Sequence, residues 1–245
     1  MAYVGGKCIN SKHIIDVLNQ PEYDGMNYVE LFCGYCHITR RVKNKKSILI
    51  NDKNELLICL LNGIRENLPY PVISRERYYE LKNQHSVITF ERAIAGFCYS
   101  YNGKLFGGYV LDNSNTPSFK KNGKLHIYYK QRQNYYEKLK QNQQFMNCKI
   151  ECKSYETFDL EGCLIYCDPP YIGTIEYDKH SGVANFDHEM FWHRIRELSK
   201  KNTVFVSEYT APDDFVVVSQ STKKSTFSGT RSNRIEKLFT LKKMD

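Results

Sequence analysis

The strongest chemical signal in the sequence is the string Asp168-Pro169-Pro170-Tyr171, which follows the apolar run at 163–167. Two consecutive prolines fix their own φ, push the residues before them toward extended backbone, and leave carbonyl groups without neighbouring N–H groups. The Asp168 carboxylate and the Pro169 carbonyl could therefore accept both hydrogens of a planar amino group, while Tyr171 stacks on the ring that carries it. Two such acceptors would stabilise the positive charge that develops on an attacking nitrogen. The string predicts a pocket for a nucleobase amine, with a simple turn after a strand as the structural alternative.

A second signal is the string Glu30-Leu31-Phe32-Cys33-Gly34, at the end of a predicted strand. Gly34 would let the turn pass close to a ligand, and free N–H groups at a following helix start would favour an anionic group. Asp52 ends the next predicted strand, and an acidic residue about 20 positions after a glycine turn can hydrogen-bond ribose hydroxyls. The pair predicts an adenosine-containing ligand; a glycine turn followed by a helix cap is the structural alternative.

Near the amino terminus, Tyr3-Val4-Gly5-Gly6-Lys7 places two glycines between an aromatic side chain and a cation. This segment could close over a ligand, or it could be a mobile terminal segment.

A basic stretch lies at residues 118–153, where eight lysines and Arg132 face only Glu137 and Glu151. The stretch holds most of the chain's net charge of +8. Aromatic residues are interleaved with these cations at Phe119, Tyr128, Tyr129, Tyr135 and Tyr136. This mixture favours phosphate contacts with a nucleic acid and packing against its sugars or bases, with a solvated helix face as the alternative.

The elements that must position these residues alternate between strand-like and helix-like patterns, which predicts an α/β fold with a mostly parallel sheet. Strands are predicted at 27–32, 47–50, 148–152, 163–167, 203–207, 215–218 and 237–241. Helices are predicted at 11–20, 35–42, 54–68, 75–83, 90–101, 124–145 and 187–200. Since ligands bind at the carboxyl ends of strands in open α/β sheets, we expect Gly34, Asp52 and Asp168 at one edge.

The composition is that of a globular protein, with 245 residues and 41% hydrophobic residues. The chain has no apolar run of about 18 residues and no secretory pattern at its start, so we expect a soluble, intracellular protein whose nine cysteines are reduced. His188 and His193 are one residue too far apart for a zinc-binding helix, and Cys33 to His37 matches a haem attachment string that needs an exported protein. We therefore expect no metal.

Taken in order, the motifs Gly-Gly-Lys7, Glu30-x-Phe-x-Gly34, Asn51-Asp-x-Asn54, a long insertion and Asp168-Pro-Pro-Tyr171 resemble those of the Dam-like alpha-class DNA adenine N6-methyltransferases. The resemblance spans nearly the whole chain. Residues 99–109 resemble the target-recognition hairpin region of that family, and residues 229–238 resemble its carboxyl-terminal segment. The resemblance implies a Rossmann-like catalytic domain at 1–67 and 148–245 that binds S-adenosylmethionine. Residues 68–147 would form an inserted, mostly helical target-recognition domain with a hairpin loop.

The resemblance also implies roles for individual residues. The target-base clamp would be Asp168, Pro169, Pro170 and Tyr171. The cofactor contacts would be Tyr3, Gly6, Lys7, Glu30, Phe32, Gly34, Asp52, Tyr155 and Asp168. The DNA contacts would be Asn102, Lys104, Lys120, Lys121, Lys124, Arg132 and Arg231. Two departures bear on cofactor affinity, since Cys36 stands where the family usually has a second glycine and Tyr3-Val4 replaces its usual Trp-Ala.

The resulting hypothesis is a site-specific enzyme that transfers the methyl group of S-adenosylmethionine to a flipped adenine in duplex DNA. It would act as a monomer or a weak dimer on DNA, without an obligate protein partner. Two alternatives stay open. One is a methyltransferase that acts on RNA or on a protein amide, and the other is a catalytically weak or silent DNA-binding relative.

Overall fold

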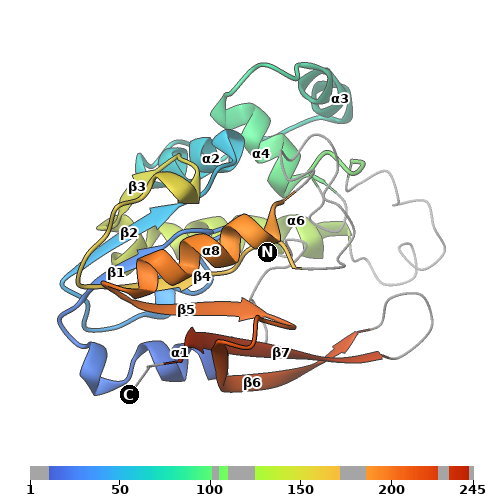
Figure 1. The fold of residues 1–245 in the computed structure, drawn as a ribbon. Coiled ribbons are helices and arrows are strands. Elements are labelled where there is room, and N and C mark those ends of the chain that lie inside the picture. The colour runs from blue at the N-terminus through green and yellow to red at the C-terminus, as the bar shows by residue number, and fades with distance from the viewer. Residues whose placement is uncertain (1–10, 101–104, 110–124, 172–185, 226–231, 243–245) are drawn as a thin grey trace.

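A computed structural model describes residues 11–100, 105–109, 125–171, 186–225 and 232–242. Its centre is a seven-stranded sheet with the strand order β3-β2-β1-β4-β5-β7-β6 (Figure 1). The five neighbouring strands β3, β2, β1, β4 and β5 are parallel to one another. Strand β7 runs antiparallel to β5, and β6 runs antiparallel to β7. The strands are β1 (Asn27–Glu30), β2 (Ser47–Asn51), β3 (Lys149–Glu151), β4 (Cys163–Cys167), β5 (Thr203–Glu208), β6 (Phe215–Ser225) and β7 (Ser232–Leu241). The predicted α/β fold with a mostly parallel sheet is confirmed.

Helices flank this sheet on both faces (Figure 1). The α-helices are α1 (Lys12–Leu18), α2 (Glu55–Arg65), α3 (Arg75–Asn83), α4 (Phe90–Cys98), α6 (Leu125–Lys140), α7 (Gln143–Met146) and α8 (His188–Ser199). Short 3₁₀ turns lie at η1 (Pro21–Tyr23), η2 (Thr39–Arg41) and η5 (Tyr155–Thr157). Side-chain oxygens of Asn54, Ser74, Thr89 and Asp187 accept backbone N–H bonds at the starts of α2, α3, α4 and α8, which fixes where these helices begin.

Three sequence predictions about elements were wrong. Residues 35–42 form turns and η2 instead of an α-helix, because Gly34 and Cys36 both have positive φ, 46° and 54°, which a right-handed helix excludes. The helix expected at 124–145 is divided, because the Asn142 side chain accepts the Phe145 N–H and starts α7 anew. The strands expected at 215–218 and 237–241 are both longer, because β6 continues to Ser225 and pairs there with Ser232, the first residue of β7.

The two faces of the sheet pack against different helices. On one face, Val29, Ile165 and Val204 form an apolar cluster with Phe191 and Trp192 of α8. On the other face, Tyr28, Leu164 and Tyr166 pack with Ile14 and Leu18 of α1. Because side chains alternate along a strand, Glu30 lies on the same face as Tyr28, and Asp168 continues the face of Tyr166.

The helices between β2 and β3 share one apolar core with the sheet. Ile50 of β2, Leu60 of α2, Phe97 of α4 and Tyr136 of α6 belong to a single buried cluster. An antiparallel bridge joins Ser100 to Tyr109, within the segment expected to hold a hairpin. The boundaries proposed for an inserted domain at 68–147 stay a prediction.

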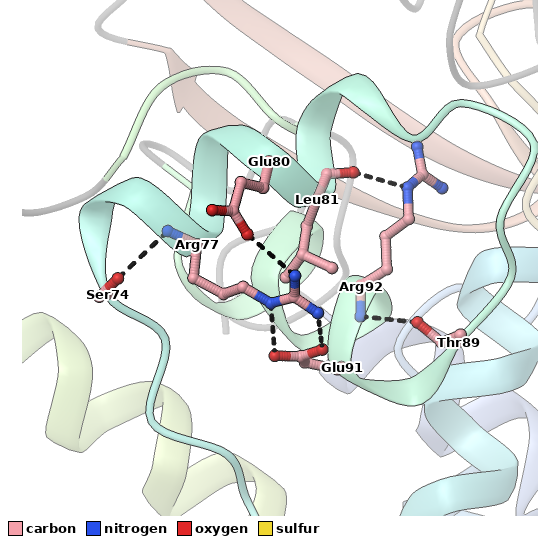
Figure 2. Close-up of polar contacts among 7 residues, drawn as sticks. All are labelled: Ser74, Arg77, Glu80, Leu81, Thr89, Glu91 and Arg92. Carbon is pink, nitrogen blue, oxygen red and sulfur yellow. Dashed lines mark hydrogen bonds and ion pairs between the residues drawn. The ribbon is translucent and has the colours of Figure 1, made fainter.

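Polar contacts hold α3 against α4 (Figure 2). The Arg77 guanidinium donates to both carboxylate oxygens of Glu91, at 2.9 and 2.6 Å, and to Glu80 at 2.9 Å. The buried Arg92 donates from Nε to the Leu81 carbonyl at 2.9 Å. These contacts orient the α3–α4 pair as one unit. None of the helices in the described ranges is both long and apolar enough to cross a membrane.

Candidate active site

The carboxyl ends of β1, β2 and β4 meet at one edge of the sheet, which we call the rim (residues 30–34, 51–52 and 167–171). Glu30 pairs with Ile50 on one side and with Tyr166 on the other. Beyond the strand, the Leu31 N–H donates to the Tyr166 carbonyl at 3.1 Å. The structure therefore brings Gly34, Asp52 and Asp168 to the same edge, as the strand pattern predicted.

The Gly34 turn and Asp52 are joined by backbone-directed hydrogen bonds. Asp52 accepts the Gly34 N–H at 3.2 Å and the Asn54 N–H at 3.0 Å. Burial raises the pKa of the Asp52 carboxyl, and these N–H donors oppose that rise. The Gly34 N–H is thus engaged by Asp52, and the helix start expected to offer free donors to an anionic ligand is absent from residues 35–38, which the structure describes as turns.

The space beside this turn suits a ligand. Among the residues that the structure describes, no heavy atom would lie within 4 Å of a Cβ built on Gly34. An open glycine turn next to a carboxylate acceptor fits a hydroxylated group such as a ribose. The residues present therefore fit the nucleoside part of the expected cofactor.

Asn51 ties the exits of three segments together, a role that the sequence analysis missed. Its buried side chain donates to the carbonyls of Leu31, at 3.0 Å, and of Lys153, at 3.1 Å, and accepts the Lys153 N–H at 2.9 Å. Its own carbonyl accepts the Cys33 N–H at 2.8 Å. The signal in the sequence was an amide side chain at the end of a buried strand. Its hydrogen-bonding groups can find partners there only in other segments of the chain.

Aromatic rings form a wall beside the exit of β3. The Phe32 ring centroid lies 5.3 Å from that of Tyr155, 6.0 Å from that of Phe186 and 5.8 Å from that of Phe191. Burial raises the pKa of Tyr155 to about 12, so its hydroxyl stays protonated. Phe32 and Tyr155, both expected at the cofactor, are in contact in the structure.

Glu30 lies beneath the rim and is only 2% exposed. Its Oε2 accepts hydrogen bonds from the hydroxyls of Tyr28, at 3.1 Å, and of Thr39. Burial raises the pKa of Glu30 to about 8, the two hydroxyl bonds oppose the rise, and the nearby Asp168 adds to it. Glu30 is therefore mostly protonated at neutral pH. A cofactor contact through its side chain stays a prediction.

The residues after β4 reach the rim with partial exposure. Asp168, Pro170 and Tyr171 are half-buried, and Pro169 is buried. The Tyr171 hydroxyl donates to Oε1 of Glu236 at 2.5 Å. The Tyr171 ring also packs edge-on against Tyr209, with centroids 4.9 Å apart and planes at 83°. Burial, followed by the charges of Asp168 and Glu236, raises the pKa of Tyr171 well above its ordinary value, so the phenol is neutral.

Glu236 is the second residue whose role the sequence analysis missed. It lies on β7, is 0% exposed, and immediately precedes Lys237, which pairs with Glu208 at the end of β5. The signal in the sequence was an acidic residue at an inward position of an alternating strand, between the exposed Ile235 and the buried Leu238.

Several predicted site residues lie outside the described residues: Tyr3, Gly6, Lys7, Asn102, Lys104, Lys120, Lys121, Lys124 and Arg231. Arg132 lies in α6. The roles proposed for all of these residues stay predictions.

Comparison with known proteins identifies the family. A search of curated proteins finds no match. Among solved structures, an rRNA methyltransferase, AviRa from Streptomyces viridochromogenes, has a TM-score of 0.42 and 10% identity over 98% of this chain and 88% of that one. A precorrin-6y C5,15-methyltransferase from Geobacter metallireducens has a TM-score of 0.39 and 7% identity over 97% and 91%. These low scores carry no weight for activity or substrate.

The sequence model of the D12 class N6 adenine-specific DNA methyltransferases matches residues 3–227. This match covers most of the chain and includes the Gly34 turn, Asp52 and the Asp168–Tyr171 string. The chain therefore belongs to the D12 class N6 adenine-specific DNA methyltransferase family.

Proposed function

We propose that this methyltransferase transfers a methyl group to the N6 amine of an adenine that is flipped out of duplex DNA at a specific site. The observation that carries the proposal is the position of Asp168 and Tyr171 at the rim. They follow β4, which pairs with β1, and β1 leads to the Gly34 turn that Asp52 holds. That arrangement offers an amine acceptor and a nucleoside site side by side, in a chain of an adenine-specific family.

S-adenosylmethionine is the cofactor of this methyltransferase and supplies an activated methyl group on a sulfonium centre. In our proposal, Asp52 holds its ribose, and Phe32 and Tyr155 pack against its adenine. The Gly34 turn lets the backbone approach it closely. Tyr3, Gly6, Lys7 and Glu30 would complete the proposed cofactor contacts, and Asp168 would be close to both the cofactor and the target base.

The chain's own part in the chemistry is to orient and activate the target amine. An exocyclic amine is a poor nucleophile because its lone pair is delocalised into the ring. The Asp168 carboxylate and the Pro169 carbonyl accept its two hydrogens and stabilise the positive charge that develops on nitrogen. Because Glu30 is mostly protonated at neutral pH, Asp168 does not share the rim with a second full negative charge at that position.

The ring of Tyr171 stacks on the flipped base. Flipping costs roughly a few kcal/mol, which stacking and the amine contacts offset. Neutrality of the phenol favours this role, since a phenolate beside Asp168 would repel it. Pro170 stiffens the segment between Asp168 and Tyr171 by fixing its own φ.

DNA is held, in this proposal, by Lys120, Lys121, Lys124, Arg132 and Arg231 through phosphates, and by Asn102 and Lys104 near the bases. Phosphate contacts set the register of the protein on the duplex, and base contacts select the site. The enzyme works as a monomer or a weak dimer on DNA, without an obligate protein partner.

The test is methyl transfer from S-adenosylmethionine to plasmid DNA, total RNA and cell protein, with N6-methyladenine quantified in the digested nucleosides. Asp168→Asn should lower the rate on DNA by roughly 10²- to 10³-fold, because it removes a charged acceptor from the developing positive charge. Asp214→Asn is the matched control, since that carboxylate pairs with Arg196 at 2.5 Å on α8, away from the rim. Methylation of RNA or protein alone, or a fully active Asp168→Asn enzyme, would contradict the proposal.

A further inference from the structure

We propose that Glu236 is a positioning residue that fixes the ring of Tyr171 for the target base. The inference rests on the proposed function, because it assigns a purpose to the orientation of that ring. The contact joins two residues that are 65 positions apart in the sequence, from the segment after β4 and from β7.

The hydroxyl of Tyr171 and the carboxylate of Glu236 are in direct contact. The Tyr171 hydroxyl and Glu236 Oε1 are 2.5 Å apart, which is in the range of a charge-assisted O–H···O⁻ bond. Such bonds are about twice as strong as those between neutral groups. The far end of the Tyr171 side chain is therefore anchored.

The backbone that carries the Glu236 carboxylate is held firmly in the sheet. Glu236 is fully buried on β7, and β7 is paired on both sides, with β5 through Lys237 and with β6 through Ser221. A carboxylate on a doubly paired strand has little freedom to follow its partner. Glu236 thus sets the position of the Tyr171 hydroxyl rather than the reverse.

A second aromatic residue, Tyr209, restricts the orientation of the Tyr171 ring. The Tyr209 ring, directly after β5, meets Tyr171 nearly edge-on, with planes at 83°. With its hydroxyl anchored by Glu236 and its ring braced by Tyr209, the Tyr171 ring cannot turn freely. A stacking ring that is already oriented avoids the entropic cost of ordering when the base arrives.

Loss of the hydrogen bond between Glu236 and Tyr171 should therefore lower kcat on DNA and leave the affinity for the cofactor unchanged. Glu236→Leu removes the acceptor, while Glu236→Gln keeps an oxygen that can accept the Tyr171 hydroxyl. We expect Glu236→Leu to lower kcat roughly ten- to a hundredfold with KM for S-adenosylmethionine unchanged. Glu236→Gln should restore most of that loss.

The matched control is Tyr166→Phe. Tyr166 lies on β4, and its buried hydroxyl lies 2.8 Å from Ser207 Oγ on β5, so this variant also deletes a buried tyrosine hydroxyl bond beside the same strands. It should leave kcat at the wild-type value. A loss of kcat as large as that of Glu236→Leu would mean that any buried hydroxyl bond here matters, and would overturn the inference.

A second readout follows the ring without turnover. We would place 3-fluorotyrosine at position 171 of the full chain and record its ¹⁹F NMR signal. In the wild-type background we expect one signal displaced from that of free fluorotyrosine. Glu236→Leu should move it toward the free value, Glu236→Gln should give an intermediate shift, and Tyr166→Phe should leave it in place. An unmoved signal in Glu236→Leu would overturn the inference.

Two further outcomes keep the inference separate from the proposed function. If the wild-type enzyme methylates no DNA while the signal responds as expected, the proposed function fails and the anchoring of Tyr171 stands. If it methylates DNA and Glu236→Leu turns over normally, only the positioning role fails. Should Glu236→Leu not fold, Tyr171→Phe decides, because it deletes the hydroxyl that Glu236 anchors and keeps the stacking ring. It should lower kcat by a similar factor, and an unchanged kcat would overturn the inference.

Discussion

The two halves of the rim are held together by different kinds of contact. On the cofactor side, at the exits of β1, β2 and β3, Asn51 and Asp52 bond to backbone groups of Leu31, Gly34 and Lys153. On the clamp side, at the exits of β4 and β5, Tyr171 is held by the side chains of Glu236 and Tyr209.

This difference has a physical meaning. Bonds from a side chain to the backbone fix the course of the chain, so the cofactor side is shaped by a few motif residues whatever surrounds them. Side-chain pairs fix only the side chains themselves, and here one of the two partners, Glu236, lies on the distant strand β7. We therefore expect variants on the cofactor side to change stability and cofactor affinity together, and variants on the clamp side to change turnover.

The largest effect is expected from Glu30, which lies beneath both halves. Its pKa in the folded protein is about 8, above the ordinary value of 4.5, so the folded state keeps a proton that the unfolded state releases. The contribution of Glu30 to the free energy of unfolding should therefore be fully present below about pH 4.5 and be lost as the pH rises to about 8, by roughly 5 kcal/mol in all.

Glu30→Gln cannot ionise and still accepts from Tyr28 and Thr39, so it should flatten this pH dependence. Urea unfolding at several values between pH 5 and pH 9 measures the difference. Glu197→Gln, at a partly exposed position on α8 where the carboxylate pairs with Lys200, is the control and should show the same pH dependence as the wild type. A Glu30→Gln protein that loses stability with pH as steeply as the wild type would contradict the assignment.

The next largest effect is expected at Asn51 on the cofactor side, where one variant should lower both stability and cofactor affinity. Asn51→Ala removes three hydrogen bonds and leaves buried backbone groups unsatisfied, for a loss of roughly 2–4 kcal/mol. It should also weaken binding of S-adenosylmethionine, measured by calorimetry.

Asn202 offers a matched control, because its side chain also makes three such bonds, to Leu160, Leu198 and Cys163, near the start of β4. Asn202→Ala should lower the free energy of unfolding without lowering cofactor affinity. If Asn51→Ala and Asn202→Ala weakened S-adenosylmethionine binding equally, the loss of affinity could not be assigned to the rim.

A smaller effect is expected at Gly34. Its φ of 46° costs a residue with a side chain about 1–2 kcal/mol, and within the described part of the chain no neighbour would clash with the added methyl group. Gly34→Ala should lower both stability and cofactor affinity. Gly162, with φ of 66° and equally open surroundings before β4, is the control. Gly162→Ala should lower stability alone, and an unchanged affinity in Gly34→Ala would show that the turn does not face the cofactor.

The smallest effect is expected at Cys36, which holds a φ of 54° in place of glycine. Cys36→Gly relieves that strain by about 1 kcal/mol but vacates the fully buried space of the thiol, a loss of similar size. The free energy of unfolding should change little, and so should cofactor affinity. A large gain in affinity would indicate that the cysteine distorts the turn.

Much of the fold could be predicted from the sequence where burial dictates the pattern. The strand at 163–167 is an apolar run because both of its faces are covered, and its predicted bounds match the structure. The turn region at 35–42 was mistaken for a helix, since its apolar spacing does not reveal a positive φ at Cys36. The outer half of β6 is polar and pairs with the part of β7 that precedes its pairing with β5, so it had no apolar pattern to follow.

The site divides in the same way. Gly34, Asp52 and Asp168 could be placed at one edge because each follows a strand, and strand ends are visible in the sequence. Glu236 could not be assigned to Tyr171, because nothing local relates two residues that meet only through the antiparallel return of β7.

The reversed direction of β7 also decides where the protein can be tethered. The strand enters the sheet at the rim and leaves it at Leu241, which pairs with Phe215 at the opposite edge. A linker to a surface or a fused reporter that starts after Leu241 would therefore project away from the rim and leave it accessible. A domain inserted between Ser225 and Ser232 would instead emerge on the rim side and obstruct it.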